Sequence, residues 1–386
     1  MAELWVGTHP AGQGTLPNRN DCTISELLRQ AGGIGELPFL YKVLSISRAL
    51  SIQVHPDKNL AEMLHRSNPE QYPDANDKPE MVVALKDMRL LHGVRPLSEI
   101  SYFVELYPQL NELWNAGEES PNAPDSETDG MQSICAGISN LMSVSEPKIE
   151  ALTIALQQSL LKKCQRGECL SEEEGLFFEL NEQHSHDPGA WFVFILNIKK
   201  LRPFESLLIS PNEPHSYISG DCLEAMKCSD NVIRIGLTNK FRDTQSFLRS
   251  LSRRHQCDRG FVFLCATQSQ SVLEYIPAPV QLFPYFRMLV VRLHTTVEVK
   301  LRMGTSQHVG TIQGVSSSAH FQVITIVHEG AIDFVRDERP PLELPRGTVW
   351  MSCCENVTRL HLTRTEDTPA LIAMCIPNTL RVAYED

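Results

Sequence analysis

The stretch SIQVHPDKNL (residues 51–60) alternates polar and apolar side chains through its first half. Its polar members Ser51, Gln53 and His55 are separated by an isoleucine and a valine. Successive side chains of a β-strand point to opposite faces, so one face is apolar and the other carries polar groups about 7 Å apart. We therefore expect a β-strand whose polar face either contacts water or lines a site.

Around this stretch, strand-like and helix-like segments follow one another in blocks. Residues 37–55 predict two short strands joined at Ser47-Arg48, the second of them alternating. From about Arg95 to Leu180 the pattern becomes helical, and Ser145-Glu146-Pro147 is typical of a helix start. The apolar stripe after this start consists of Ile149, Leu152, Leu156 and Leu160.

Beyond Trp191 the segments are again short, rich in β-branched residues and separated by turn residues. The run WFVFILNIKKL (191–201) predicts a strand, and so do HSYISG (215–220) and VIRIGL (232–237). The last hundred residues repeat this pattern, with a break near residues 257–281, and predict a second all-β domain. The fold class is mainly β with a helical insertion. We expect a discontinuous β domain (1–94 and 181–256), a helical domain (95–180) and a C-terminal β domain (257–386).

Composition excludes several classes of function. The formal net charge of −12 argues against sequence-independent nucleic-acid binding, which depends on clustered Lys and Arg. No apolar run approaches the roughly 20 residues of a membrane helix. Eleven cysteines occur without a CxxC pair, and no basic stretch followed by an apolar run opens the chain. This usage is typical of a reducing compartment, and we expect a cytoplasmic protein.

Several polar groups could meet the polar face of the strand at Gln53 and His55. Glu80 follows a polar loop, and His215 enters a predicted strand. Two imidazoles, a carboxylate and an amide oxygen form a mixed set that suits Zn²⁺ or another borderline divalent ion. The alternative is that each histidine is a hydrogen-bonded structural residue. A second candidate, His184-Ser185-His186-Asp187, is interpreted as a surface turn and not as a metal site.

The chain resembles type I mannose-6-phosphate isomerases over its first 240 residues. The stretches that carry the resemblance are AELWVGTHP (2–10), LPFLYKVLS (37–45), SIQVHPDK (51–58), YPDANDKPEM (72–81), NEPHSYISGDC (212–222) and SDNVIRIGLTNKF (229–241). The resemblance implies a cupin-type jelly-roll catalytic domain, a helical domain and a second cupin-like domain. It also implies one Zn²⁺ per chain, with Gln53, His55, Glu80 and His215 as ligands.

The same resemblance implies roles for further residues. Arg234, Lys78, Glu224 and Asp230 would be catalytic, and Ser51, Tyr217 and Lys240 would bind substrate. The implied reaction is the zinc-dependent interconversion of mannose 6-phosphate and fructose 6-phosphate, which supplies mannose donors for glycosylation. Such an isomerase moves a proton between two carbons through an enediol, so it needs an acid and base and a group that stabilises an oxyanion. Lys78, Glu224, Asp230 or a zinc-bound water could be the base.

Three departures from the family pattern keep other interpretations open. The chain begins directly before the AELW motif, so we expect the upstream strands and aromatic wall to be missing and turnover to be slower. Asp77 stands where the family has a histidine, and Lys227 where it has an alanine. The alternative function is a weak or inactive paralogue that binds zinc and sugar phosphate, and a purely structural two-cupin protein is disfavoured. The expected partner is a small sugar phosphate, with no nucleic acid and no membrane, and the expected state is a monomer.

Overall fold

The structure is a computed structural model of residues 1–386. It describes residues 2–16, 22–30, 35–117 and 127–252, and then a series of shorter segments. These segments are 264–265, 272–275, 286–293, 296–303, 321–329, 332–336, 342–346, 348–354, 357–365, 370–376 and 380–385. Within this described part, no helix is both long and apolar enough to cross a membrane.

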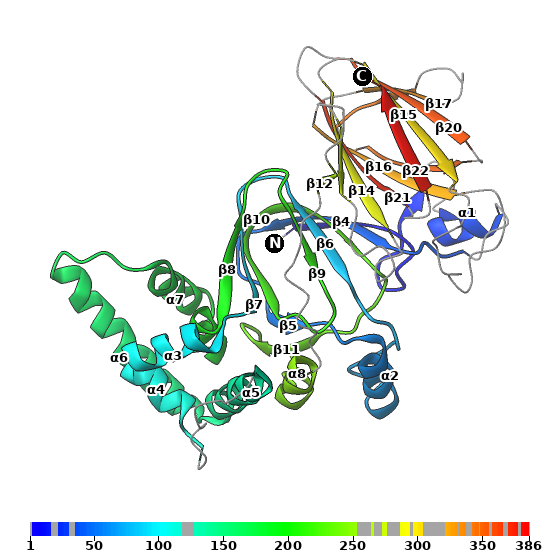
Figure 1. Cartoon of the computed structure of the whole chain (residues 1–386). Coiled ribbons are helices and arrows are strands. Elements are labelled where there is room, and N and C mark those ends of the chain that lie inside the picture. Colours follow the sequence, from blue (N-terminus) through cyan, green and yellow to red (C-terminus); the bar gives the residue numbers. More distant parts are fainter. Residues whose placement is uncertain are drawn as a thin grey trace.

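The central part of the molecule is a nine-stranded antiparallel arrangement built around one long strand, β10 (Figure 1). The first residue of β10, His215, pairs with β5 and β7, whereas the second half of β10 pairs with β4 and β6. The long strand therefore joins two sets of strands that face each other. The nine strands are β1 (Ala2–Val6), β4 (Leu40–Ile46), β5 (Ile52–Val54), β6 (Glu80–Ala84), β7 (Met88–Val94), β8 (Leu196–Leu201), β9 (Ser206–Ile209), β10 (His215–Met226) and β11 (Ile233–Gly236).

Strand β5 is the alternating stretch, and its predicted sidedness is confirmed. Ile52 and Val54 are fully buried, while Gln53 between them is half-buried on the opposite face. Helix α2 (Lys58–Ser67) follows, and the Asp57 carboxylate caps it by accepting the Leu60 N–H at 2.8 Å. This cap fixes the point where the chain leaves the strand. A small hairpin of β2 (Thr15–Leu16) and β3 (Cys22–Thr23) and helix α1 (Ile24–Gln30) lie between β1 and β4.

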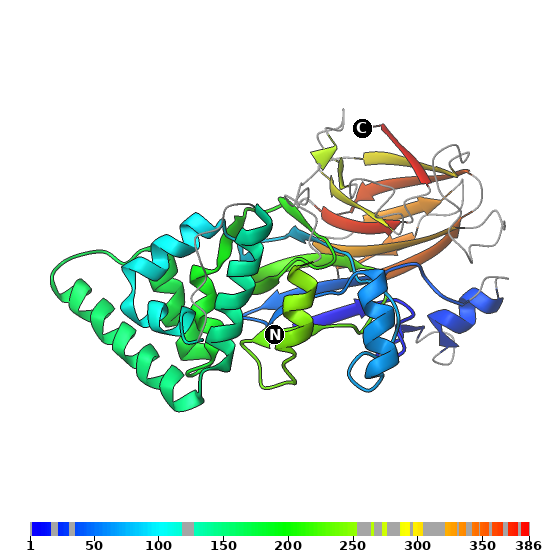
Figure 2. The same cartoon turned by 60° about the horizontal axis from the view of Figure 1, so that its bottom comes forward.

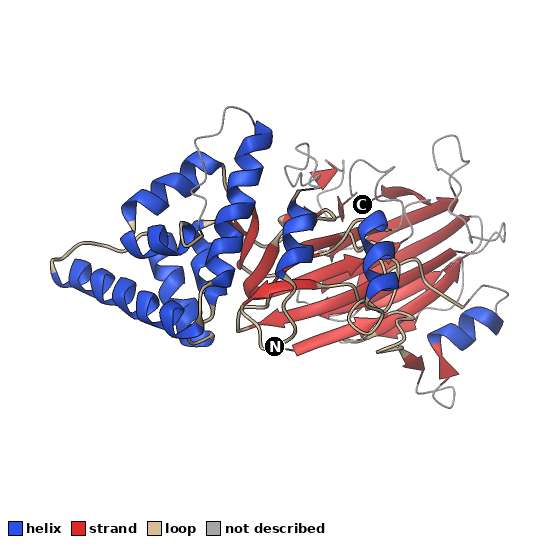
Figure 3. Ribbon diagram, turned by 90° about the horizontal axis from the view of Figure 1, so that it is seen from below, coloured by secondary structure: helices blue, strands red, loops and turns tan. Residues whose placement is uncertain are grey.

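Helices gather at one end of the central strands (Figures 1 and 3). They are α3 (Leu97–Leu106), α4 (Pro108–Trp114), α5 (Glu127–Ser143), α6 (Glu146–Gln165) and α7 (Glu172–Gln183), and α8 (Thr244–Leu251) packs beside β11. The predicted start of α6 at Ser145 is confirmed. Its predicted apolar stripe is confirmed as well, because Ile149, Leu156 and Leu160 are buried. The boundaries at 94, 180 and 256 stay predictions.

The predicted strand beginning at Trp191 is wrong over its first residues. Residues Pro188–Phe194 form a 3₁₀ helix, and strand β8 begins only at Leu196. The run from Trp191 to Phe194 is completely buried. A continuous apolar run buried on all sides lacks the alternation that distinguishes strand from helix. Pro188 in the first turn and the Asp187 carboxylate, which accepts the Gly189 N–H at 2.7 Å, determine the helical start.

The C-terminal region is a second β structure made of two sheets, as predicted (Figures 1 and 2). One sheet has the order β12-β13-β14-β21-β16-β19, and the other β18-β17-β20-β15-β22. The strands are β12 (Leu264–Cys265), β13 (Val272–Tyr275), β14 (Arg287–Leu293), β15 (Thr296–Met303), β16 (Phe321–Glu329), β17 (Ile332–Arg336), β18 (Leu342–Leu344), β19 (Val349–Cys354), β20 (Val357–Arg364), β21 (Ala370–Ile376) and β22 (Leu380–Glu385). One buried cluster contains Tyr41 and Met81 of the first β region together with Met288 and Cys375 of the second, so the two share a core.

Candidate metal centre

Three side chains that are distant in the sequence meet in the interior. His55 follows β5, Glu80 opens β6 and His215 opens β10. One potential ligand atom from each lies within 4.8 Å of the other two. The exposed fractions of the three residues are 0%, 2% and 1%. Polar groups buried this completely are costly unless they are paired or bind an ion.

Hydrogen bonds set the direction in which both imidazoles point. His55 Nδ1 donates to the carbonyl oxygen of Asn231 at 2.8 Å, and His215 Nδ1 donates to the carbonyl oxygen of Glu213 at 3.0 Å. A carbonyl oxygen can only accept, so each Nδ1 must carry the proton. The Nε2 lone pairs then point at the Glu80 carboxylate, with 3.2 Å from His55 Nε2 to Oε1 and 3.5 Å from His215 Nε2 to Oε2.

The protonation states of these side chains favour a bound cation. Burial, and then the nearby Lys78 ammonium, lower the pKa of His55 to about 4. Burial opposes ionisation of Glu80, but the Lys78 ammonium holds its pKa well below the ordinary value. A neutral imidazole therefore presents a lone pair to a carboxylate, and the buried His55 Nε2 has no hydrogen-bond partner. A divalent ion bound between these atoms would satisfy all of them, so the residues fit a metal.

Gln53 borders the same cluster. Its Nε2 lies 3.2 Å from His215 Nε2, and the Ser51 hydroxyl donates to its Oε1 at 3.1 Å. The oxygen and nitrogen of an amide exchange places by a half-turn of the last side-chain bond. After such a turn, Oε1 would point to the cluster as a fourth ligand. The structure therefore brings together all four predicted ligand residues and Ser51.

Two of the predicted catalytic residues are Lys78, which lies beside the cluster, and Glu224, which lies on β10. Lys78 Nζ is 3.2 Å from Glu80 Oε1, so this ammonium contacts a ligand directly. Glu224 is buried and accepts the Tyr217 hydroxyl at 3.0 Å, while its other oxygen pairs with Lys42 Nζ at 2.9 Å. Burial, reinforced by Glu224, raises the pKa of Tyr217 well above its ordinary value, so this phenol stays protonated.

Asp230 is partly exposed and has a partner from the N-terminal segment. Its Oδ1 lies 3.2 Å from His9 Nε2, with 47% of the aspartate side chain exposed. The His9 ring stands edge-on to Trp5, and the Trp5 ring lies under Lys42 Nζ at 4.7 Å from its centroid. The first residues of the chain thus place an aromatic side chain next to the Lys42–Glu224 pair.

Arg234 is the arginine that emerges beside the ligands. It is the register partner of Gln53 across β5 and β11, so both side chains project on the same face. Burial lowers the pKa of Arg234, and no described carboxylate lies within ion-pair distance of its guanidinium. Lys240, by contrast, is exposed, and its ammonium makes no hydrogen bond or ion pair with the described residues. The structure does not place Lys240 against the cluster.

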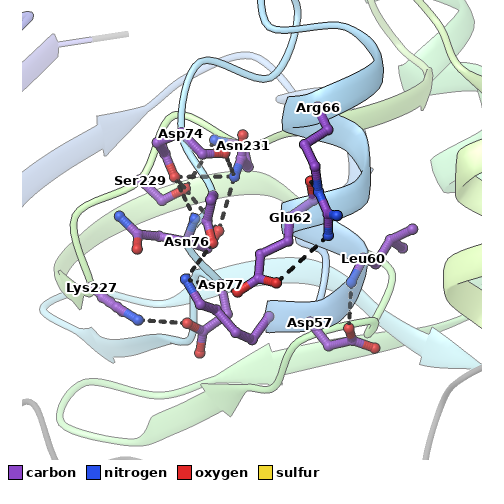
Figure 4. Close-up of polar contacts among 12 residues, drawn as sticks. Asp57, Leu60, Glu62, Arg66, Asp74, Asn76, Asp77, Lys227, Ser229 and Asn231 are labelled. Carbon is purple, nitrogen blue, oxygen red and sulfur yellow. Dashed lines mark hydrogen bonds and ion pairs between the residues drawn. The ribbon is translucent and has the colours of Figure 1, made fainter.

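Three residues near the cluster were missed by sequence reasoning. They are Lys42, His9 and Asn231, and each contacts a predicted site residue from a remote part of the chain. All three lie within the stretches that carry the family resemblance, and this is the only sequence feature that could have pointed to them. The two unusual residues also meet, because Lys227 Nζ pairs with Asp77 Oδ1 at 2.5 Å (Figure 4). One departure from the family pattern thus compensates the charge of the other.

The interpretation of residues 184–187 as a surface turn needs one correction. Ser185 and His186 do form a turn, but Asp187 is only 8% exposed. Its carboxylate accepts the N–H groups of Gly189 and Leu237 at 2.7 and 2.8 Å and pairs with Arg242 at 2.8 Å. Asp187 is therefore a structural hub between the 3₁₀ helix and the loop after β11.

Comparison with known proteins gives consistent results. Residues 1–97 match the family model of the phosphomannose isomerase type I catalytic domain. Mannose-6-phosphate isomerase of Mus musculus is 33% identical over 92% of this chain and 89% of its own length. The Homo sapiens enzyme is 31% identical over 97% of this chain and 89% of its own. A Salmonella typhimurium mannose 6-phosphate isomerase structure, bound to substrate (f6p) and zinc, has a TM-score of 0.70 at 23% identity, over 98% of this chain and 91% of that one.

The fold and the buried cluster define a cupin-type protein with a site of metal-binding character, as predicted. Two β domains flank the shared core, and a helical insertion extends from one end. The coverage and identity to the mouse and human enzymes are decisive. The chain belongs to the type I mannose-6-phosphate isomerase family.

Proposed function

We propose that this protein is a zinc-dependent aldose-ketose isomerase that interconverts mannose 6-phosphate and fructose 6-phosphate and so supplies mannose donors for glycosylation. The observation that carries the proposal is the buried His55–Glu80–His215 cluster, whose lone pairs converge on one point, in a chain of this family. Gln53 would complete a set of four ligands. A zinc ion bound there would act as a Lewis acid toward negative charge on the sugar oxygens.

The surrounding side chains supply the remaining chemistry. A proton must leave one carbon and reach the next, so a group that exchanges protons has to lie close to the ion. Of Lys78, Glu224 and Asp230, only Lys78 contacts a ligand among the described residues, and we assign it the principal proton-transfer role at Nζ, which must first give up its own proton in order to accept one from the sugar carbon. Glu224 is held between Lys42 and Tyr217 and would orient sugar hydroxyls or assist the transfer.

Arg234 would bind the developing negative charge or the phosphate. Its planar fork can form paired hydrogen bonds to an oxyanion, and its guanidinium has no described carboxylate partner to displace. Ser51 and Tyr217 would line the substrate pocket, and Asp230 would act at its exposed margin. Lys240 would contribute only a distant charge to the phosphate, because the structure gives it no contact that fixes its position.

The wider setting follows from composition. A small sugar phosphate is the expected partner, since the net charge of −12 does not favour a nucleic acid. The absence of a CxxC pair in the sequence supports a reducing compartment, and we place the protein in the cytoplasm as a monomer.

The experiment that tests this proposal is a coupled assay of mannose 6-phosphate turnover on purified protein with its zinc content measured. The expected result is turnover together with about one zinc per chain, lost on chelation and restored by added zinc. Zinc at full occupancy without turnover would support the inactive-paralogue alternative. A protein without metal and without turnover would support a structural role. Lys78→Met, Glu224→Gln and Asp230→Asn compared at saturating substrate would then rank the proton-transfer candidates, with Lys78→Met slowest.

A further inference from the structure

The carboxylate of Asp74 accepts hydrogen bonds from two loops that border the His55–Glu80–His215 cluster (Figure 4). Its Oδ1 accepts from the Asn76 N–H at 2.8 Å and from the Ser229 hydroxyl at 2.9 Å. Its Oδ2 accepts the Asp230 N–H at 2.8 Å. Asp74 thus ties the loop before β6 to the loop between β10 and β11. The first loop carries Lys78 and leads to Glu80, and the second leads to Arg234.

Asn231 connects this junction to the cluster. The Asn231 side chain is completely buried, and its Nδ2 lies 3.1 Å from Asp74 Oδ1, 2.8 Å from the Asp74 carbonyl and 2.9 Å from the Asn76 carbonyl. The main-chain carbonyl of the same asparagine accepts the His55 Nδ1 proton at 2.8 Å. Two hydrogen bonds in sequence therefore lead from the Asp74 carboxylate to an imidazole of the cluster.

The position of the Asn231 peptide decides two properties of His55. Its carbonyl oxygen fixes the proton on Nδ1 and limits rotation of the ring, so Nε2 keeps pointing toward Glu80 and His215. Partners that orient a metal-bound histidine in this way commonly affect metal affinity nearly as much as the ligands do. Any change that releases Asn231 should let the ring turn away, even though no ligand atom has been altered.

We propose that Asp74 is a positioning residue, which preorganises the metal centre by holding Asn231 and, through it, His55. This inference rests on the proposed function, because it takes the cluster to be a metal site. It assigns to Asp74 no contact with metal or substrate. Its effect passes through the loop junction that Asp74 forms with Ser229 and Asn231.

The test compares Asp74→Asn with the wild type as folded apoprotein, with zinc affinity measured by competition against a chromophoric chelator. Asparagine has nearly the same size, but it replaces one acceptor oxygen with a donor group, and the Asp230 N–H or the Ser229 hydroxyl loses its acceptor. The expected result is zinc binding weakened by about tenfold. A second readout is the visible spectrum of the Co²⁺-loaded protein, which should change because the ligand geometry changes.

Asp187→Asn is the matched control. Asp187 is also a carboxylate hub, which accepts N–H groups from Gly189, Leu237 and Thr238, but it touches none of the cluster residues. The control should lower the thermal midpoint and leave zinc affinity and the Co²⁺ spectrum unchanged. If Asp74→Asn fails to fold, Ser229→Ala removes one donor to the same carboxylate and should weaken zinc binding by a smaller factor.

Wild-type zinc affinity and an unaltered Co²⁺ spectrum in Asp74→Asn would overturn the positioning role. Equal weakening in Asp74→Asn and Asp187→Asn would also overturn it, because general loosening of the fold would then explain both. A wild-type protein that binds no zinc would contradict the proposed metal centre itself. That outcome is distinguishable, since it appears before any variant is compared.

Discussion

Strand β10 carries two buried polar groups at opposite ends, and they differ in how their charges are balanced. At the Glu224 end, the carboxylate has the Lys42 ammonium at 2.9 Å and the Tyr217 hydroxyl at 3.0 Å. Beside His215, the Glu80 carboxylate of the neighbouring strand β6 faces two imidazole lone pairs, and only Lys78 offsets its charge. In the first group, both oxygens of the Glu224 carboxylate have partners from the protein itself.

This difference separates a carboxylate whose charge is balanced by protein groups from an ion-binding site of similar composition. Both groups are buried, and both contain a carboxylate beside a lysine. What distinguishes them is the direction of the neighbouring atoms, because the Glu224 partners donate protons while the histidine Nε2 atoms offer lone pairs. A carboxylate that faces two imidazole lone pairs is suited to a cation. Removing a group should therefore have different consequences at the two ends.

The largest expected effect follows from removing a ligand. His215→Ala should abolish measurable zinc binding and isomerase turnover, since partners one step further out already cost about 10–100-fold in affinity. Isothermal titration of the chelated variant with zinc checks the first part, and the coupled assay checks the second. Glu224→Gln is the comparison from the other end of β10 and should retain one zinc. Full zinc affinity in His215→Ala would remove the histidine from the ligand set.

The next effect concerns Arg234, the register partner of Gln53 across β5 and β11. Arg234→Lys keeps the charge but loses the planar fork, so kcat should fall by about 10²–10³ while zinc content and thermal midpoint stay close to wild type. Steady-state kinetics at saturating substrate, paired with a thermal melt, separate the two quantities. An unchanged kcat would reject a direct role of Arg234 in the reaction. A thermal midpoint that falls together with the activity would reject it as well.

For the buried Lys42–Glu224 pair the expected effect is on stability. Lys42→Met leaves a buried carboxylate beside Tyr217 without its cation, and unfolding should become easier by about 3–5 kcal/mol. The double variant Lys42→Met/Glu224→Gln should be less destabilised than the single one, because no unpaired charge remains. Denaturant unfolding of the zinc-loaded proteins measures both values. Additive losses in the double variant would show that the two side chains are not energetically coupled.

Local patterns were sufficient for the strand that carries Gln53 and leads to His55, and for the helix that starts after Ser145. The alternation around Gln53 predicted β5 because burial on one face follows the two-residue period of a strand, and the stripe from Ile149 predicted α6 for the corresponding reason. The same reasoning failed at Trp191, where burial on every side erases the period. Periodicity reports the difference between two faces, and a segment with no exposed face has none.

The ligand set itself depended on the family resemblance, and the supporting residues lay beyond either approach. His55 and Asn231 are 176 positions apart, and no local pattern links an imidazole to a main-chain carbonyl at that separation. Lys42 is one polar residue in the predicted strand that became β4, and nothing around it in the sequence indicates a partner. Its pairing with Glu224 follows only from the register of β4 and β10. Asp77 and Lys227 were noticed individually as unusual residues, while their pairing required the fold.

The smallest expected effect concerns that last pair. Asp77–Lys227 lies near the surface of the site, with 16% and 18% of the two side chains exposed, and it joins the loop before Glu80 to the end of β10. Asp77→Asn, Lys227→Met and the double variant form a double-mutant cycle, in which the coupling should be about 1 kcal/mol. Zinc affinity should stay close to wild type in all three. A coupling near zero would show that the two charges do not stabilise each other.

The most direct test of the difference between the two ends is a zinc titration of the chelated wild-type protein, followed by calorimetry and by mannose 6-phosphate turnover on the same samples. The account predicts saturation at about one zinc per chain, with turnover rising in proportion to bound zinc. The thermal midpoint should rise as well, because an ion that binds only the folded protein stabilises it. Full turnover in the metal-free sample, or saturation without any gain in turnover, would contradict the account.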